Sequence, residues 1–353
     1  AMLWLIYEGI LQCSALNIYY YSFFNLTFSV GVFLYCAFFY FFPLFCYFLM
    51  YKQDAISYKR EILFDQSRLV YVLRILLSLI TAIVLFNLIK HGFPPALSFW
   101  GQETKNYVEY GSLKQVLYAV LPVVMCFSVL AKKYSYLILC MFVYFLFVAR
   151  GPFLTGVSSV LIFSFLLGRI KLRTIILIFI ISMLLNSVVG EMRTGKALFL
   201  DYMNIRLEKS DWDMSVLWFV SYVATPFSNM MWIIHDGLIG PFGQSLITLL
   251  PGSGRDGIID DVSYPYKIID GAHGYLTPIF NDYGLVGVAF FNLILGVSFC
   301  IIHRKGSVVL YSYFLGLLVF IFFYNAFLQL VTLLSVLFLQ FGLKYITDRE
   351  VVN

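Results

Sequence analysis

Long uninterrupted apolar segments recur along the chain, and they constrain the fold more than any other feature of the sequence. A helix needs about 20 residues to cross a bilayer, and about ten segments reach or approach that length. None shows the strict alternation of a membrane β-strand. Only 12% of the 353 residues are charged, whereas a soluble domain carries about 25%. The sequence therefore predicts an all-α polytopic membrane protein.

The predicted spans divide the chain into three parts. We expect N-terminal transmembrane helices over 1–190, one large extracytoplasmic loop over 191–282, and C-terminal transmembrane helices over 283–353. Several segments are short, so the prediction of about ten helices covers a range of about nine to twelve. The predicted spans are 2–22, 24–50, 69–89, 115–131, 134–149, 152–168, 174–190, 283–302, 308–325 and 327–343.

Basic residues cluster on alternate connections between these spans. The positive-inside rule assigns such connections to the cytoplasm, and both chain termini then lie there as well. The localisation expected from this pattern is an inner membrane, with the large loop on the outer face. The clusters are Lys52 to Arg68, Lys132 and Lys133, Arg169 to Arg173, Arg304 and Lys305, and Lys344 and Arg349.

The large loop is partly apolar. Its segment 214–235 is broken at Thr225-Pro226, so neither half can span the bilayer. Such halves fit a re-entrant or interfacial helix pair. The segment 241–252 lies between helix breakers and predicts another short interfacial helix.

Cationic side chains on the outer side are candidates for binding a lipid-anchored anion. Arg150 stands in "ARGPFLTG", a turn so short that its guanidinium must lie at the membrane interface, and Arg193 follows the end of a span. A diphosphate offers paired oxygens that match the guanidinium fork, and arginines can neutralise it as it leaves. Lys196, Arg206 and Arg255 are further candidates in the large loop.

His273 is the candidate base, because its unperturbed pKa of about 6.5 suits proton transfer near neutral pH. Small neighbours and a position just ahead of the span at 283 hold it near the interface. We expect structural roles for His91 and His235, and His303 to be part of the charged cytoplasmic cap.

Other classes of site are not indicated by the sequence. No HExxH or Cys/His cluster predicts a metal, and no GxxxxGK[ST] or GxGxxG predicts a nucleotide site. The six cysteines lie in or beside apolar runs and predict small core residues. The sequence has no separate basic patch of the kind that binds nucleic acid, and no cofactor is expected.

Two motifs resemble a known family. The stretch "AHGYLTPIFNDYGLVG" resembles the signature of the O-antigen ligase and Wzy-type polymerase superfamily, in which a histidine precedes Asp/Glu-x-Gly-x-x-Gly and a late span. The stretch "ARGPFLTGV" resembles the Arg-Gly turn of Wzy-type polymerases and the Arg-x-x-x-Leu pattern of the ligases. The layout of spans around one large outer loop is similar too. The Arg-x₁₀-Gly pattern of some polymerases does not occur here, and His-Gly replaces the His-Asn of many ligases, which favours a polymerase.

The resemblance implies a GT-C-like membrane glycosyltransferase of the bacterial inner membrane with a periplasmic active site. Donor and acceptor would both be undecaprenyl-diphosphate-linked oligosaccharides, joined without a metal and with inversion, and a chain-length regulator is a possible partner. His273 would be the base, and Arg150, Arg193 and Arg255 would bind the diphosphate, with Lys196 and Arg206 as further candidates.

Two alternatives remain open at the level of sequence. An O-antigen ligase would use the same chemistry but transfer the glycan to lipid A-core. A transporter or flippase of lipid-linked oligosaccharide would need two similar halves and a coupling site near the membrane midplane. The sequence has no two-fold hydropathy repeat, and its one-sided loop favours chemistry at the membrane surface.

Overall fold

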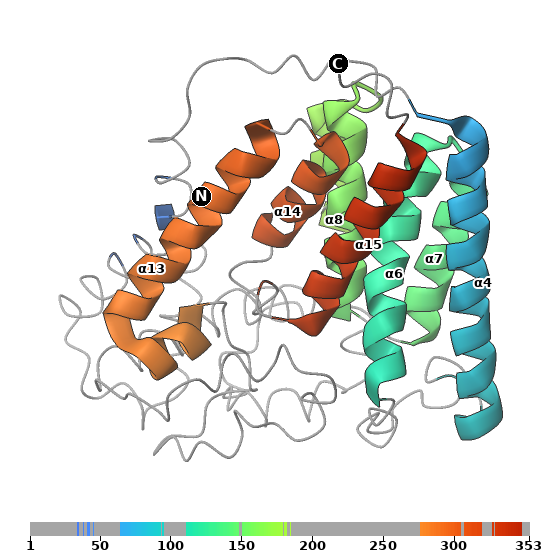
Figure 1. Ribbon diagram of the computed structural model, residues 1–353, viewed down its shortest axis with the longest axis horizontal. Helices are drawn as coiled ribbons and strands as arrows, with labels where there is room; N and C mark the ends of the chain where they lie inside the picture. Colours follow the sequence, from blue (N-terminus) through green and yellow to red (C-terminus); the bar gives the residue numbers. More distant parts are fainter. Residues whose placement is uncertain are drawn as a thin grey trace, which may run out of the picture.

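The structure, a computed structural model, describes the greater part of the predicted spans and little of their connections. Every regular element in these residues is an α-helix (Figure 1), and each overlaps a predicted span. The predicted spans 2–22, 24–50 and 174–190 fall wholly or largely outside them, as does most of the large loop. The described residues are 64–92, 111–147, 150–178, 276–304, 307–319 and 329–347, with the single positions 34, 38, 41, 42, 45, 94, 180, 181, 184 and 327.

The described helices are predominantly apolar, as in a membrane-embedded helical protein. Three of those described are long and apolar enough to cross a membrane: α4 (Gln66–His91), α6 (Gly111–Leu130) and α13 (Leu276–Arg304). Four described helices are shorter: α7 (Tyr134–Leu146), α8 (Arg150–Leu166), α14 (Val308–Val319) and α15 (Leu330–Ile346).

Helix α6 is the centre of the bundle. From Leu117 onward its residues are buried on every side, because α4, α7, α8 and α15 all pack against it. A helix that is apolar all round must be covered on every side by protein or lipid, and the neighbouring helices cover α6. Pro122 lies inside α6 and cannot donate to the carbonyl of Tyr118, yet the surrounding helices keep the segment helical.

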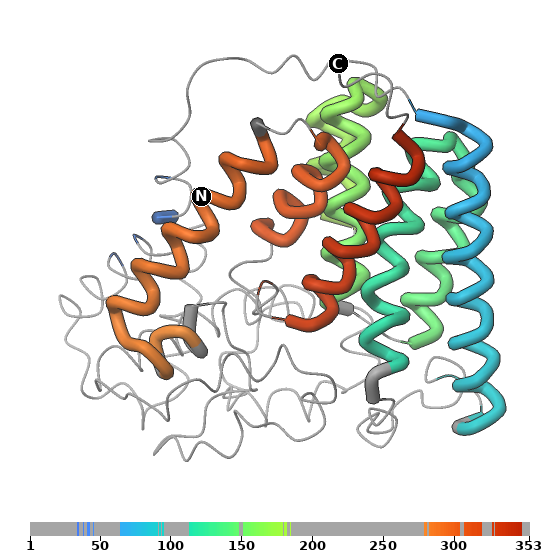
Figure 2. The backbone as a smooth tube through the Cα atoms, viewed as in Figure 1, coloured from blue at the N-terminus to red at the C-terminus, as the bar shows by residue number. Residues whose placement is uncertain are grey.

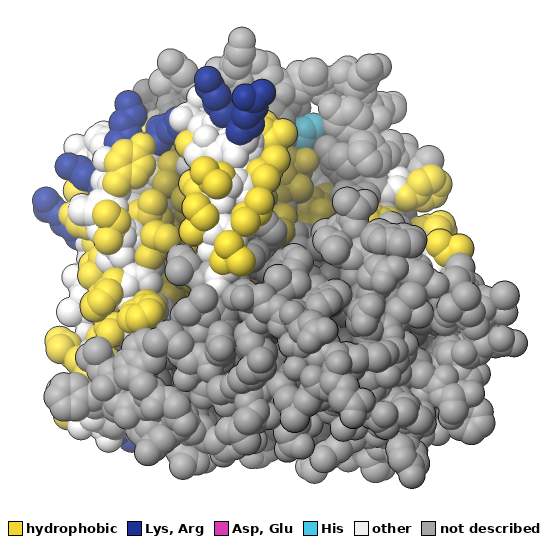
Figure 3. All heavy atoms as spheres, turned by 180° about the vertical axis from the view of Figure 1, so that it is seen from behind, with side chains coloured by type: hydrophobic (Ala, Val, Ile, Leu, Met, Phe, Trp, Pro, Cys, Tyr) yellow, Lys and Arg dark blue, Asp and Glu magenta, His cyan; other side chains and the backbone are white. Residues whose placement is uncertain are grey.

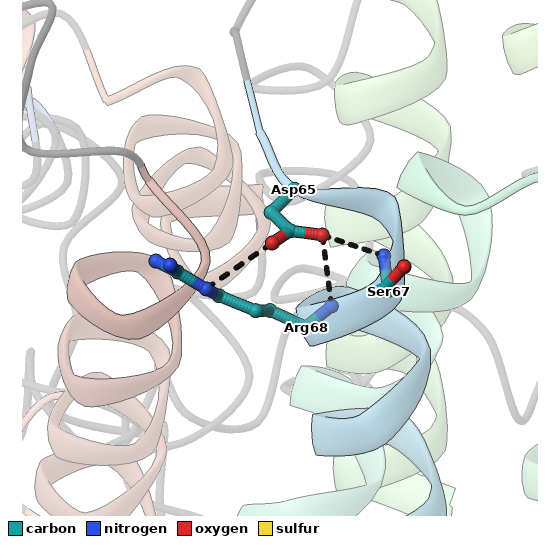
Figure 4. Close-up of polar contacts among 3 residues, drawn as sticks. All are labelled: Asp65, Ser67 and Arg68. Atoms are coloured by element: carbon teal, nitrogen blue, oxygen red, sulfur yellow. Dashed lines mark hydrogen bonds and ion pairs between the residues drawn. The ribbon is translucent and has the colours of Figure 1, made fainter.

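The start of α4 is capped and tied to the end of α15. One carboxylate oxygen of Asp65 accepts hydrogen bonds from the backbone N–H groups of Ser67 (2.8 Å) and Arg68 (3.2 Å), and its other oxygen lies 3.2 Å from Nε of Arg68 (Figure 4). The backbone N–H of Asp65 donates to the carbonyl of Ile346 at 2.9 Å. The backbone hydrogen bond therefore joins the two helix ends, while the side chain of Asp65 caps the first turn of α4.

Beyond its cap, α4 presents one buried stripe and one exposed apolar face. The stripe repeats every three or four residues, the spacing that places side chains on one side of a helix. Exposed apolar side chains of this size are expected where lipid, not water, covers a helix. The stripe consists of Leu69, Leu73, Leu76, Ile80, Ile83 and Asn87, and the exposed face includes Tyr71, Ile75, Leu85, Phe86 and Ile89.

Small residues allow two pairs of helices to approach closely. A Cβ atom added to Gly316 of α14 would lie 2.2 Å from Oγ of Ser159 on α8 and 2.8 Å from its backbone nitrogen. A Cβ atom added to Gly342 of α15 would lie 2.6 Å from the ring of Phe127 on α6. Close backbone approach at glycine and serine is typical of helix pairs in membranes, where dispersion contacts replace the hydrophobic drive.

The described basic clusters gather at one end of the bundle, which we call the basic end. Figure 1 shows α4, α7 and α14 beginning there and α6, α8, α13 and α15 ending there. In Figure 3, Lys and Arg side chains lie at the same end, above described helices whose surface is largely hydrophobic. The described basic residues concerned are Arg68, Lys132, Lys133, Arg169, Lys171, Arg173 and Lys344.

One of these cations has a structural role at the basic end. The side chain of Arg169, just beyond α8, donates a hydrogen bond to the carbonyl of Val129 in the last turn of α6. That carbonyl is one of the last four of the helix, and it also accepts a hydrogen bond from the backbone N–H of Lys132 at 3.2 Å, so Arg169 supplies a second donor. A positive charge there also suits the negative end of the helix dipole.

Candidate functional site

Arg150 lies at the end of the bundle opposite to the basic end. It is the first residue of α8, so its backbone is at the start of that helix, and α8 runs from this opposite end towards the basic end (Figure 1). Pro152 follows in the first turn, where a missing N–H costs nothing. The N-terminal end of a helix carries partial positive charge. The start of α8 is therefore a position that favours an anion.

The other predicted site residues lie outside the described residues. These are the candidate base His273 and the candidate diphosphate ligands Arg193, Lys196, Arg206 and Arg255. The structure therefore describes the backbone of Arg150 and, of the motif that contains His273, the residues from Leu276 onward.

The second half of the His273 motif forms a sharp elbow in α13. Residues before Gly284 form a short helical segment, the chain turns at Gly284, and the long apolar helix follows (Figure 2). Gly284 has φ 61° and ψ −158°, a backbone conformation that residues with a Cβ atom rarely adopt. The elbow lies at the end of α13 remote from the basic end. Residues 276–282, which the sequence analysis assigned to the large loop, are thus already helical.

Gly287 has a separate structural reason to be glycine. A Cβ atom there would lie 2.1 Å from Cβ of Tyr283, on the other side of the turn. The Gly-x-x-Gly spacing of the motif therefore combines one residue that supplies the backbone turn with one that makes room for it.

Asp282 is a polar residue of the elbow that the sequence analysis did not single out. Asp282 is 3% exposed, Asn292 farther along α13 is fully buried, and both residues have interaction partners. A carboxyl group and an amide within an apolar helix are costly unless partnered, so they help to fix the start of α13 in place. Their signal in the sequence was a polar residue inside or bordering an apolar run.

Two further buried amides were missed in the same way. Nδ2 of Asn87 on α4 and Oε1 of Gln115 on α6 are buried and have no hydrogen-bond partner. Both residues lie towards the end of the bundle remote from the basic end, as Arg150 does. Polar side chains in such positions are expensive in a membrane protein and commonly mark function.

The position of His303 requires a correction. It lies at the basic end, as expected, but it is not part of a solvated cap. Its side chain is only 7% exposed, and its ring centroid lies 5.3 Å from that of Tyr311 on α14. The ring is buried because α13 packs against α14 at this level, and it contributes to that contact.

The described cysteines behave as the sequence predicts. Cys126, Cys140 and Cys300 are buried and form no disulfide, and they pack as small side chains. Among the residues that the structure describes, no group of three or more His, Cys, Asp or Glu side chains could hold a metal ion.

Comparison of the chain with protein-family models, with curated proteins and with solved structures finds no match.

Proposed function

We propose that this protein is a membrane glycosyltransferase that polymerises polyprenyl-diphosphate-linked oligosaccharide repeat units. The fold we propose is GT-C-like, with about ten transmembrane helices, and the membrane is the bacterial inner membrane. The basic end would face the cytoplasm together with both termini, and the opposite end would face the periplasm.

The proposal is carried by the position of two motifs that are far apart in the sequence but lie at the same end of the bundle. Arg150 begins α8, and the "DYGLVG" elbow begins the long part of α13, both at the end remote from the basic end. A transferase working on a lipid diphosphate needs a cation and a base on one membrane face. His273 stands three residues before α13 in the sequence, and we propose that it lies on the same face.

The proposed reaction is a single displacement at the anomeric carbon. A hydroxyl oxygen of one lipid-linked repeat unit attacks the anomeric carbon of a glycan held on a second polyprenyl diphosphate. A C–O bond forms, the bond between the anomeric carbon and the phosphate oxygen breaks, and configuration inverts. His273 accepts the hydroxyl proton, and the diphosphate leaves with its negative charge.

Arg150 would stabilise that departing charge. Its guanidinium can donate two parallel hydrogen bonds to a pair of phosphate oxygens, which an ammonium cannot do. The N-terminal end of α8, where Arg150 stands, also carries partial positive charge from the helix dipole. Arg193, Arg255, Lys196 and Arg206 are the further candidates to neutralise the second phosphate, and a metal ion is not required for this chemistry.

The test is an in vitro assay with purified protein and purified lipid-diphosphate repeat unit as the sole substrate. A polymerase converts it to a ladder of products, whereas an O-antigen ligase or a flippase supplied with this substrate alone gives no ladder. His273→Ala should abolish the ladder at normal protein level, and a full ladder from that variant would refute its role as the base.

Arg150→Lys should lower the initial rate by tenfold or more, because about 1.5–3 kcal/mol is typical of a lost hydrogen bond to a charged group. Matched controls are Arg173→Lys at the basic end and His235→Ala in the large loop, both of which should polymerise normally. A wild-type rate for Arg150→Lys would leave Arg150 as a charge that only sets topology.

A further inference from the structure

Two connections at the basic end are held together by one backbone oxygen. The turn between α6 and α7 carries Lys132 and Lys133, and Arg169 follows α8. The carbonyl of Val129 accepts hydrogen bonds both from the side chain of Arg169 and from the backbone N–H of Lys132. The guanidinium of Arg169 therefore lies against the turn that carries the two lysines, and three cations from separate connections meet there.

Lys132 has a backbone conformation that glycine would adopt at lower cost. Its φ is 58°, in the left-handed region, and the N–H of Lys133 then donates to the carbonyl of Ser128 at 2.8 Å. Helix α8 ends with the same hydrogen-bond pattern, but Gly168, with φ 69°, occupies the equivalent position. A lysine where glycine makes the same turn indicates a use for its side chain beyond ending the helix.

These three cations have no described carboxylate to neutralise them. All three are exposed, and none forms an ion pair with a described residue. The described acidic residues are Asp65, which pairs with Arg68, and Asp282, which lies in the elbow at the other end of the bundle. Lys171 is also exposed and follows two residues after Arg169, which adds a fourth positive charge. The turn between α6 and α7 therefore presents positive charge to an anion.

An exposed apolar face begins directly beside the cations. Tyr134, the first residue of α7, follows Lys133, and the face continues through Ile138, Phe142 and Phe145, which are all between 47% and 65% exposed. Their spacing of three or four residues places them on one side of α7. Figure 3 shows Lys and Arg side chains bordering exposed hydrophobic side chains at this end of the bundle. A ligand that fits both features has an anionic head and apolar chains.

We infer that the α6–α7 turn and the exposed face of α7 bind an anionic phospholipid. The headgroup phosphate accepts hydrogen bonds from Lys132, Lys133 and the guanidinium of Arg169, which has N–H groups beyond the one given to Val129. The acyl chains cover the apolar face of α7. Basic clusters beside spanning helices are typical binding sites for anionic headgroups. An acidic protein segment would match the charge but leave the apolar face uncovered, so a lipid fits better.

The experiment titrates the purified full-length protein in a nonionic detergent and measures bound lipid by native mass spectrometry. Phosphatidylglycerol is the probe, phosphatidylcholine has the same phosphate and acyl chains without net negative charge, and inorganic phosphate lacks the chains. We expect the wild-type protein to bind phosphatidylglycerol at lower concentration than phosphatidylcholine, and an excess of inorganic phosphate not to displace it. Equal binding of the two lipids, or displacement by inorganic phosphate, would overturn the proposal.

Lys132→Gly is the decisive variant, because it removes a cation and leaves a residue that suits a φ of 58°. The Tm of the lipid-free protein should stay the same or rise, since glycine adopts this conformation at lower cost. The affinity for phosphatidylglycerol should fall about fivefold, the effect typical of one basic residue at a membrane surface. An unchanged affinity, whatever the Tm, would remove Lys132 from the site and contradict the proposal.

Lys133→Gln tests the neighbouring cation by itself and should also weaken phosphatidylglycerol binding about fivefold. The matched control is Lys344→Gln, which removes one charge at the basic end on α15, a helix that ends against the start of α4. Lys90→Gln removes one charge near the opposite end of α4. Both controls should bind phosphatidylglycerol as the wild-type protein does. Equal losses in Lys133→Gln and Lys344→Gln would mean that the lipid responds only to overall charge, and the site at the α6–α7 turn would be refuted.

Discussion

Replacing Gly316 by alanine should destabilise the contact between α8 and α14. The added methyl carbon would lie 2.2 Å from Oγ of Ser159, 2.8 Å from its backbone nitrogen and 2.9 Å from its Cα atom. The Ser159 hydroxyl cannot move away freely, because it donates to the carbonyl of Thr155 at 2.7 Å. Two of the three contacts involve backbone, so the helices themselves must separate. Overpacking of a tight core typically costs about 1–3 kcal/mol, and we expect the upper half of this range.

The same reasoning predicts a smaller effect at Gly342. Its added methyl would meet two ring atoms of Phe127, at 2.6 and 2.7 Å, and no backbone atom. A ring can tilt, so Gly342→Ala should cost less than Gly316→Ala. Ser159→Ala should rescue Gly316→Ala only in part, because the backbone nitrogen and Cα atom of Ser159 remain in place.

The assay is unfolding of the purified protein in mixed micelles with rising denaturing detergent, followed by far-UV circular dichroism. The control is Ser78→Ala on the exposed side of α4, which should leave the midpoint unchanged. An unchanged midpoint for Gly316→Ala, or complete rescue by Ser159→Ala, would show that α8 and α14 do not approach as closely as described.

Three further changes test the ends and turns of the helices. Asp65→Ala should lower the unfolding free energy by about 1 kcal/mol through loss of the cap of α4. Asp65→Asn should retain most of the wild-type stability, because asparagine also caps helices; equal losses in the two variants would contradict a capping role. Arg169→Met should destabilise the bundle by about 1 kcal/mol, because the carbonyl of Val129 loses one of its two donors and keeps only the backbone N–H of Lys132, whereas Lys171→Met should not. Gly284→Ala should cost about 1–2 kcal/mol, since φ is 61°, and should reduce the product ladder; full polymerisation with unchanged stability would mean that the elbow is not needed for activity.

Much of the helical layout could be predicted because membrane helices follow local rules. An apolar run such as the one in α4 must satisfy its backbone within a helix wherever no water is present, so its length alone indicates a span. The alternation of basic clusters predicts that they share one face, and the described clusters do gather at one end. His303 shows where this reasoning fails: its neighbours in the sequence are charged, but packing of α14 against α13 buries its ring.

The candidate site was predictable only in its chemical types. Arginine at the start of α8 and a histidine before α13 can be chosen from the sequence because few side chains suit diphosphate binding and proton transfer. The elbow at Gly284 and the burial of Asp282 could not be predicted from residue types in this way. Both depend on how the chain folds back at the start of α13.

By itself, the sequence determined that this chain is helical, membrane-embedded and asymmetric in charge, because hydropathy and charge act on each segment separately. Tertiary structure alone decided that α6 is enclosed by four neighbours, that Gly316 faces Ser159, and that the Asn87 donor lacks an acceptor. The physical reason is that these properties belong to pairs of helices. An apolar helix looks the same in sequence whether lipid or protein covers it, so only packing assigns its partners.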